Sequence, residues 1–73
     1  MKVNLNKISD VNKFVDAMMR CPIEADLISG RYVIDAKSVM GIFSLDLSKP
    51  IDIVFHGRMS DEDFKRIEEF IIE

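Results

Sequence analysis

The sequence predicts an α+β domain in which a four-stranded, mainly antiparallel sheet carries three helices on one face, an open-faced β-sandwich. Three observations support this class. Short segments alternate apolar with polar residues, the segments between them repeat apolar residues every three or four positions, and the two patterns follow the order β-α-β-β-α-β-α. Each predicted strand has only one apolar face, so the other face of the sheet should be solvated. Residues 1–73 suffice for a single domain with one small core.

The chain begins with a short strand and an amphipathic helix. Val3 and Leu5 alternate with polar residues, which is typical of a strand with one buried face. The helix is indicated by an apolar stripe at helical spacing: Val11, Phe14, Val15 and Met18. We expect Ser9 or Asp10 to cap this helix, since either side chain can accept a free backbone N–H. Pro22 should end it, because proline disfavours a helical residue before it.

A β-hairpin and a second helix come next. Residues 23–28 and 32–36 read as two short strands, and Gly30 lies in the turn between them. Ser38 then begins a shorter helix. The apolar side chains of this helix fall on two neighbouring sides: Val39, Ile42 and Phe43 on one, and Met40, Phe43 and Leu47 on the other.

Residues 51–55 form the clearest predicted strand, with an apolar side chain at every second position. The last helix should begin after Ser60, a good N-cap, and acidic residues 61–63 complement the positive end of its dipole. Its buried stripe should consist of Phe64, Ile67 and Ile71, with Phe70 beside it. Six side chains should be buried together: Phe14, Val15, Ile53, Phe55, Phe64 and Ile67. Four polar residues should lie on the open sheet face: Asn4, Glu24, Asp26 and Asp52.

Composition and charge narrow the possible partners. The net charge of −3 argues against binding to nucleic acid or to acidic membrane surfaces, which requires a basic field. No apolar segment approaches the roughly 20 residues of a membrane helix, and the first residues lack a hydrophobic signal core. Cys21 is the only cysteine, so it has no internal disulfide partner and we expect a cytoplasmic protein.

Few residues in the chain are suited to chemistry. His56 is the only histidine, and neither it nor Cys21 belongs to a motif with metal-ligand spacing. We interpret His56 as a surface residue at a strand end and Cys21 as a small buried or half-buried side chain. The acidic residues 61–63 are explained by their place at the start of a helix. We therefore expect no metal, no cofactor and no enzymatic activity.

One segment resembles a known family. It reads Ala36-Lys37-Ser38-Val39-Met40-Gly41-Ile42-Phe43-Ser44-Leu45. This is similar to the segment that opens the short second helix in HPr, the histidine-containing phosphocarrier family of the bacterial sugar phosphotransferase system. The order of the predicted elements fits that family along nearly the whole chain. The resemblance implies an HPr-like open-faced β-sandwich and a role connected with the phosphotransferase system.

The nucleophile of the phosphocarrier family is missing. In that family, the histidine of a His-x-Arg-Pro motif at the start of the first helix accepts a phosphoryl group from phosphoenolpyruvate through a partner enzyme. Residues 6–13 occupy this place and contain no His, Arg or Pro. Lys7 and Ser9 are poor substitutes, because an ammonium is not nucleophilic at neutral pH and a serine phosphate is too stable to relay. His56 lies before the last helix, so no catalytic residue is expected.

Ser38 and the helix after it are the best candidates for a functional site. The resemblance implies that Ser38 is a regulatory phosphorylation site, as in Gram-positive relatives; the alternative is that it is only a helix cap. The resemblance also implies that Val39, Met40 and Phe43 dock onto partner proteins. Alternatively, Met40 and Phe43 belong to the core, to which we assign their neighbours Ile42 and Leu45.

We therefore interpret the chain as an HPr-like regulatory module without phosphohistidine carrier activity. Its partner would be a protein, either a transcription regulator or a component of the phosphotransferase system. The alternative is a divergent phosphocarrier that still transfers phosphoryl groups through another residue. A nucleic-acid-binding module is disfavoured by the net charge of −3 and by the scarcity of aromatic residues for base stacking.

Overall fold

The chain folds into four strands and three α-helices in the predicted order. A computed structural model describes residues 1–72. The elements are β1 (Lys2–Val3), α1 (Ile8–Met19), β2 (Glu24–Ser29), β3 (Tyr32–Asp35), α2 (Val39–Phe43), β4 (Ile51–His56), α3 (Asp61–Ile67) and the 3₁₀ helix η1 (Glu68–Phe70). The α+β class, the element order and the open-faced sandwich are confirmed.

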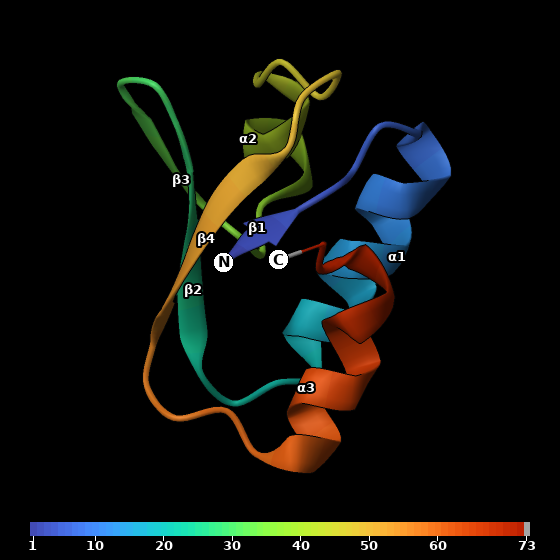
Figure 1. The fold of residues 1–73 in the computed structure, drawn as a ribbon, viewed down its shortest axis with the longest axis vertical. Coiled ribbons are helices and arrows are strands. Elements are labelled where there is room, and N and C mark those ends of the chain that lie inside the picture. Colours follow the sequence, from blue (N-terminus) through green and yellow to red (C-terminus); the bar gives the residue numbers. More distant parts are fainter. Residues whose placement is uncertain (73) are drawn as a thin grey trace.

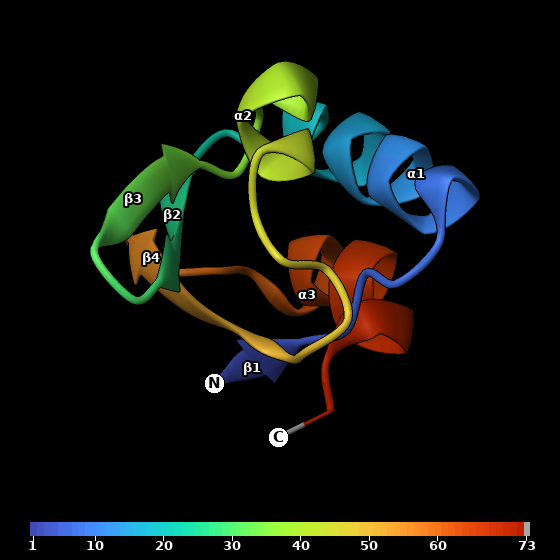
Figure 2. The same ribbon diagram turned by 90° about the horizontal axis from the view of Figure 1, so that it is seen from above.

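All four strands belong to one antiparallel sheet with the order β1-β4-β2-β3. β4 therefore lies between β1 and β2, and its Asp52 pairs with Lys2 of β1. On the far side of β1, Val3 makes a single bridge to Ile71. Figure 1 and Figure 2 show from two directions that the helices cover one face of the sheet and leave the other open.

β2 and β3 form the predicted hairpin around a two-residue turn. Ser29 pairs with Tyr32, so Gly30 and Arg31 are the turn residues. Gly30 has a φ of 58°, and no residue other than glycine has a positive φ within 1–72. A positive φ at the first turn residue alone fits a type II′ turn, whose twist matches that of the flanking strands.

The core lies between the sheet and the helices. The predicted stripe of α1 is buried: Val11, Phe14, Val15 and Met18. Phe14 meets Phe70 edge to face, with ring centroids 5.6 Å apart and the rings at 89°. The other buried members of the core are Val3, Leu5, Ala25, Leu27, Ala36, Ile42, Leu45, Ile51, Ile53 and Ile67. The alternating and helical patterns of the sequence thus identify most of the core.

α1 begins earlier than the sequence indicates. Its N-cap residue is Lys7, whose side chain makes no capping hydrogen bond, so the prediction of Ser9 or Asp10 as the cap is wrong. The Lys7 carbonyl accepts hydrogen bonds from the N–H groups of Asp10 and Val11, at 3.0 and 3.1 Å. Because Ile8 is 70% exposed, water can satisfy the free N–H groups at this end, and no side-chain cap is needed.

The C-terminal helix turns a different side to the core than expected. α3 ends at Ile67 and continues as a 3₁₀ helix, whose three residues per turn shift the side chains that follow. Ile67 and Phe70 are buried, whereas Phe64 and Ile71 are half-buried. Phe55 of β4 is also half-buried, and it packs against the rim of the core. Phe55 and Phe64 are therefore corrected from buried core residues to half-buried ones, of which only Phe55 packs against the core.

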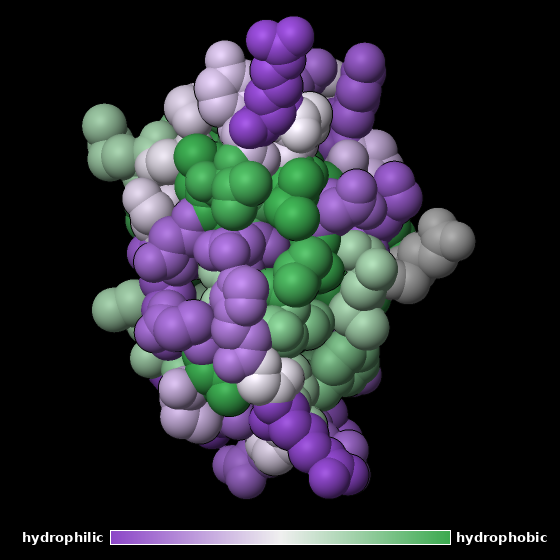
Figure 3. All heavy atoms as spheres, turned by 90° about the vertical axis from the view of Figure 1, so that its left-hand side faces the viewer, coloured by the Kyte–Doolittle hydropathy of each residue, from purple (hydrophilic) through white to green (hydrophobic). Residues whose placement is uncertain are grey.

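The open face of the sheet carries both polar and apolar side chains. Three of the four polar residues expected there are found in its strands: Glu24, Asp26 and Asp52. Asn4 is not, because it follows β1 and its N–H donates to the Phe70 carbonyl at 2.9 Å. Two apolar side chains, Val33 and Val54, are 62% and 44% exposed on this face. Figure 3 views this side of the molecule and shows hydrophobic side chains gathered among hydrophilic ones.

Candidate functional site

Short hydrogen-bonded contacts fix the turn that leads into α2. The carboxylate of Asp35 accepts the N–H of Lys37 at 2.9 Å, and the Asp35 carbonyl accepts the N–H of Ser38 at 3.0 Å. The ammonium of Lys37 donates to the Cys21 carbonyl at 3.1 Å and to the Glu24 carboxylate at 3.4 Å. The start of α2 is therefore tied to the segment between α1 and β2.

Ser38 caps α2, as the sequence predicts. Its Oγ accepts the N–H of Gly41 at 3.1 Å, and its carbonyl accepts the N–H of Ile42 at 3.0 Å. A hydroxyl in this position satisfies one of the free N–H groups of the first turn. Ser38 is half-buried, so part of the residue remains in contact with solvent while its hydroxyl is engaged.

Gly41 allows α2 to lie directly on β3. A methyl group at its Cα would come 2.6 Å from Cγ2 of Ile34 and 3.0 Å from Oγ of Ser38. Such separations are well inside van der Waals contact, so a side chain at this position requires the helix or the strand to move. Gly41 is thus needed for close packing, and its φ is not positive.

The apolar side chains of α2 divide between the core and the surface. Ile42 is fully buried and Leu45 is 7% exposed, as expected for core residues. Val39 is half-buried and packs against the core. Met40 is 82% exposed and Phe43 is 39% exposed, so neither belongs to the core. We call the half-buried Ser38 and the exposed Met40 and Phe43 together the α2 surface.

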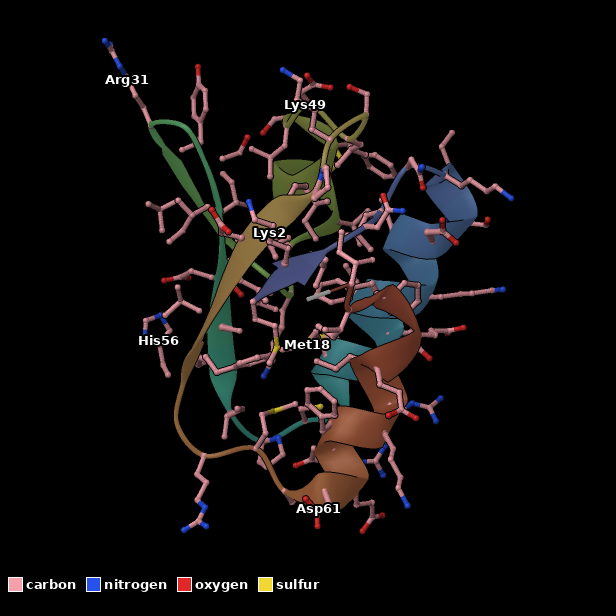
Figure 4. The ribbon with its side chains drawn as sticks, viewed as in Figure 1. Lys2, Met18, Arg31, Lys49, His56 and Asp61 are labelled. Carbon is pink, nitrogen blue, oxygen red and sulfur yellow. The ribbon has the colours of Figure 1, made fainter. Side chains whose placement is uncertain are left out.

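The N-terminus of α1 and the histidine lie on different parts of the molecule. Lys7 and Ile8 begin α1, on the covered side of the sheet. His56 ends β4, and its Nε2 is 2.7 Å from Oδ2 of Asp26 on β2. Figure 4 shows His56 pointing away from the helices. His56 is exposed at a strand end, as predicted, and the fold does not bring it to the start of α1.

The other side chains considered for chemistry have structural partners. Cys21 is 2% exposed, and burial raises the pKa of its thiol above the ordinary value of 9.0, with the charge of Asp63 acting in the same direction. Asp63 is 8% exposed, and its carboxylate is 2.6 Å from Nη1 of Arg66. Its N–H donates to Ser60 Oγ at 3.0 Å, which confirms the predicted cap of α3. Cys21 is buried, as expected.

Residues 1–72 form no pocket, and no group of three or more His, Cys, Asp or Glu side chains among them is arranged to hold a metal ion. None of the helices in this part of the chain combines the length and apolar character needed to cross a bilayer. Comparison of the chain with family models, curated proteins and solved structures gives no match. The candidate site is therefore a surface, and the α2 surface is the part that the sequence also singles out.

A second exposed apolar feature was not predicted. Tyr32 and Val33 at the start of β3 are 65% and 62% exposed. The sequence gives a signal for this feature, because residues 32–34 are consecutively apolar instead of alternating. Such a run places apolar side chains on both faces of a strand. That β3 lies at the edge of the sheet follows only from the strand order.

Proposed function

We propose that the protein is an HPr-like regulatory module that binds another protein through the α2 surface and does not carry phosphohistidine. The observation that carries the proposal is the exposure of Met40 and Phe43 on the short helix that Ser38 caps. Exposed methionine and aromatic side chains suit protein recognition, because they are apolar and methionine adapts its shape to a partner. The open-faced sandwich agrees with the fold that the resemblance of residues 36–45 implies.

The lack of carrier activity rests on chemistry. Phosphoryl relay of this kind needs a nucleophilic imidazole near backbone N–H groups that hold the phosphoryl oxygens. Residues 6–13 supply no imidazole. His56, the only one in the chain, lies on the open side of the sheet next to Asp26. The protein would therefore act by binding, with a transcription regulator or a phosphotransferase component as its partner in the cytoplasm.

Ser38 is the proposed switch of this surface. A phosphate on its Oγ would add about −1.5 to −2 charges at neutral pH, at the start of the same short helix that carries Met40 and Phe43. The added charge would weaken docking into apolar or acidic sockets and favour partners that present arginine. The capping role does not conflict with this proposal, because phosphate oxygens can also accept the N–H of Gly41.

The binding test uses purified phosphotransferase components and the regulator that mediates catabolite repression. Affinities of the wild type, Ser38→Ala, Ser38→Asp and Met40→Glu are compared by titration calorimetry. Met19→Glu is the matched control, because Met19 is 64% exposed on a different helix. We expect Met40→Glu to weaken binding at least about tenfold, Ser38→Asp to change partner preference, and Met19→Glu to have no effect. Equal binding by all folded variants would exclude the α2 surface.

The carrier test separates the proposal from a divergent phosphocarrier. The protein is incubated with labelled phosphoenolpyruvate and the phosphotransferase enzyme that phosphorylates HPr. We expect no acid-labile label. If stoichiometric acid-labile label appears and is lost in His56→Ala, the protein is instead a phosphocarrier, with His56 as the phosphorylated residue.

A further inference from the structure

The outer edge of β3 has unpaired backbone groups. Tyr32 pairs with Ser29, and the N–H of Ala36 donates to the Ala25 carbonyl at 2.9 Å, so the even-numbered residues of this strand face β2. Backbone groups alternate in direction along an antiparallel strand. The N–H and C=O of Val33 therefore point away from the sheet, and within residues 1–72 neither takes part in a hydrogen bond.

This edge lacks several of the features that usually prevent pairing, although the strand is short and ends in a charged residue, Asp35. β3 contains no proline, lysine or bulge, and it pairs with β2 without interruption. Its first two side chains, Tyr32 and Val33, are more than half exposed. An edge of this kind is a template for another strand.

We propose that β3 pairs with β3 of a second copy of this chain, antiparallel and with Val33 opposite Val33. Residue numbers across a two-fold antiparallel pair add to a constant, so this register places Tyr32 opposite Ile34 and Arg31 opposite Asp35. The outward N–H and C=O of Val33 then bond reciprocally to those of the other Val33. The two sheets join into one of eight strands.

Charge selects this register. Within residues 1–72, neither Arg31 nor Asp35 forms an ion pair, and Figure 4 shows Arg31 extending from the hairpin tip away from the molecule. Centring the pair on Val33 gives two opposite-charge contacts between the copies. Outward groups also stay opposed when the centre moves by one residue, but Arg31 then faces Val33 or Lys37 and both contacts with Asp35 are lost. A move by two residues places Arg31 against Arg31 or Asp35 against Asp35. Like charges directly opposite each other are unfavourable across strands.

The same arrangement also brings the apolar side chains of the edge into contact with each other. Side chains opposite each other in a sheet lie on one face, so the two Val33 side chains meet on the open face. Tyr32 meets Ile34 of the other copy on the covered face. Because β3 is only four residues long, the contact area is at the low end for protein interfaces. The dimer should therefore be reversible and should depend on concentration and salt.

The test is sedimentation velocity of the full chain over a concentration series, with Arg31→Glu, Asp35→Arg and Val33→Pro. We expect each variant to raise the dimer dissociation constant about tenfold or more, because two contacts become repulsive or two hydrogen bonds are lost. Arg58→Glu is the charge-matched control, since Arg58 is an exposed residue in the loop before α3, and it should dimerise like the wild type. Circular dichroism checks that every variant is folded.

A mixture of the two charge-reversal variants provides the decisive test of the register. An equimolar mixture of Arg31→Glu and Asp35→Arg restores opposite charges at both contacts only in a mixed dimer with the proposed register. Recovery of dimer in the mixture, with neither variant dimerising alone, supports the proposal. A wild type that stays monomeric up to millimolar concentration overturns it. A dimer that Arg31→Glu and Val33→Pro leave unchanged, or a mixture that does not recover, overturns it equally.

Discussion

Gly41 of α2 and Ile34 of β3 are in such close contact that a methyl group at position 41 would lie 2.6 Å from Ile34 Cγ2. The contact joins the helix that carries the candidate site to the edge strand of the sheet. Cγ2 of Ile34 is attached to the rigid branch of the side chain and cannot move away by rotating a flexible end. The position of α2 therefore depends on the absence of a side chain at Gly41.

Gly41→Ala should lower the free energy of unfolding by about 1–2 kcal/mol in a denaturant titration. The overpacking against Ile34 costs about 1–3 kcal/mol, and the better helix propensity of alanine offsets part of it. In an Ile34→Ala background, the same substitution should be neutral or stabilising, because the obstructing methyl group is gone. An equal loss in both backgrounds would show that the two residues are not coupled.

Ser38→Ala should lower the free energy of unfolding by about 1 kcal/mol, because the N–H of Gly41 loses its side-chain acceptor. Ser38→Asp should lose much less, since aspartate is also a good N-cap. Ser60→Ala, which removes the equivalent bond at 3.0 Å in α3, is the reference for a cap without a proposed regulatory role. If Ser38→Ala unfolds like the wild type, the hydroxyl contributes nothing as a cap.

Phe14→Ala should be among the most destabilising single truncations, at about 3–5 kcal/mol. Phe14 is fully buried and contacts Phe70 edge to face, so truncation leaves a cavity within the core. Phe55→Ala should cost clearly less, because Phe55 is half-buried at the rim. Thermal and denaturant unfolding of the two variants measures both losses of stability. A larger loss of unfolding free energy for Phe55→Ala than for Phe14→Ala would contradict this prediction.

Cys21 should make stability fall at alkaline pH. Burial, reinforced by the charge of Asp63, raises the pKa of the thiol in the folded protein above the ordinary value of 9.0. The unfolded chain therefore loses this proton at lower pH than the folded protein, and the contribution of Cys21 to stability declines as pH rises above about 9. We expect the stability difference between the wild type and Cys21→Ala to decrease over this range.

A reactivity measurement checks the same property of Cys21. In the native protein at pH 8, the thiol should react with a disulfide reagent far more slowly than in denaturant, because the thiolate is the reacting form and the side chain is buried. Reaction at the rate of the unfolded chain would contradict the burial.

Local chemistry explains which parts of the fold could be predicted. The caps Ser38 and Ser60 are recognisable because the acceptor and the N–H that it binds are three residues apart. The burial of Phe14 follows from a long, regular helical stripe. The start of α1 could not be predicted, because a solvated helix end needs no side-chain cap. The expectation that Ile71 is buried assumes α-helical spacing throughout; the switch to a 3₁₀ helix after Ile67 aligns Phe70 with Ile67 instead.

The candidate site was only partly predictable for a related reason. In a five-residue helix such as α2, apolar residues occupy nearly every direction, so the sequence leaves open whether Met40 and Phe43 join Ile42 in the core or face solvent. The position of Gly41 on Ile34 resolves this by fixing which side of the helix lies against β3. The exposure of Val33 depends on the strand order, to which residues far apart in the sequence contribute.

The central place of β4 shapes how the chain must fold. The hairpin of β2 and β3 needs only neighbouring residues, but the pairing of Lys2 with Asp52 closes a loop that spans most of the chain. Loop closure on that scale costs entropy before any contact compensates it, and folding slows as contacts become less local. Until β4 arrives, the inner edge of β2 is as open as the outer edge of β3. The period of greatest risk for aggregation is therefore the interval between hairpin formation and insertion of the central strand.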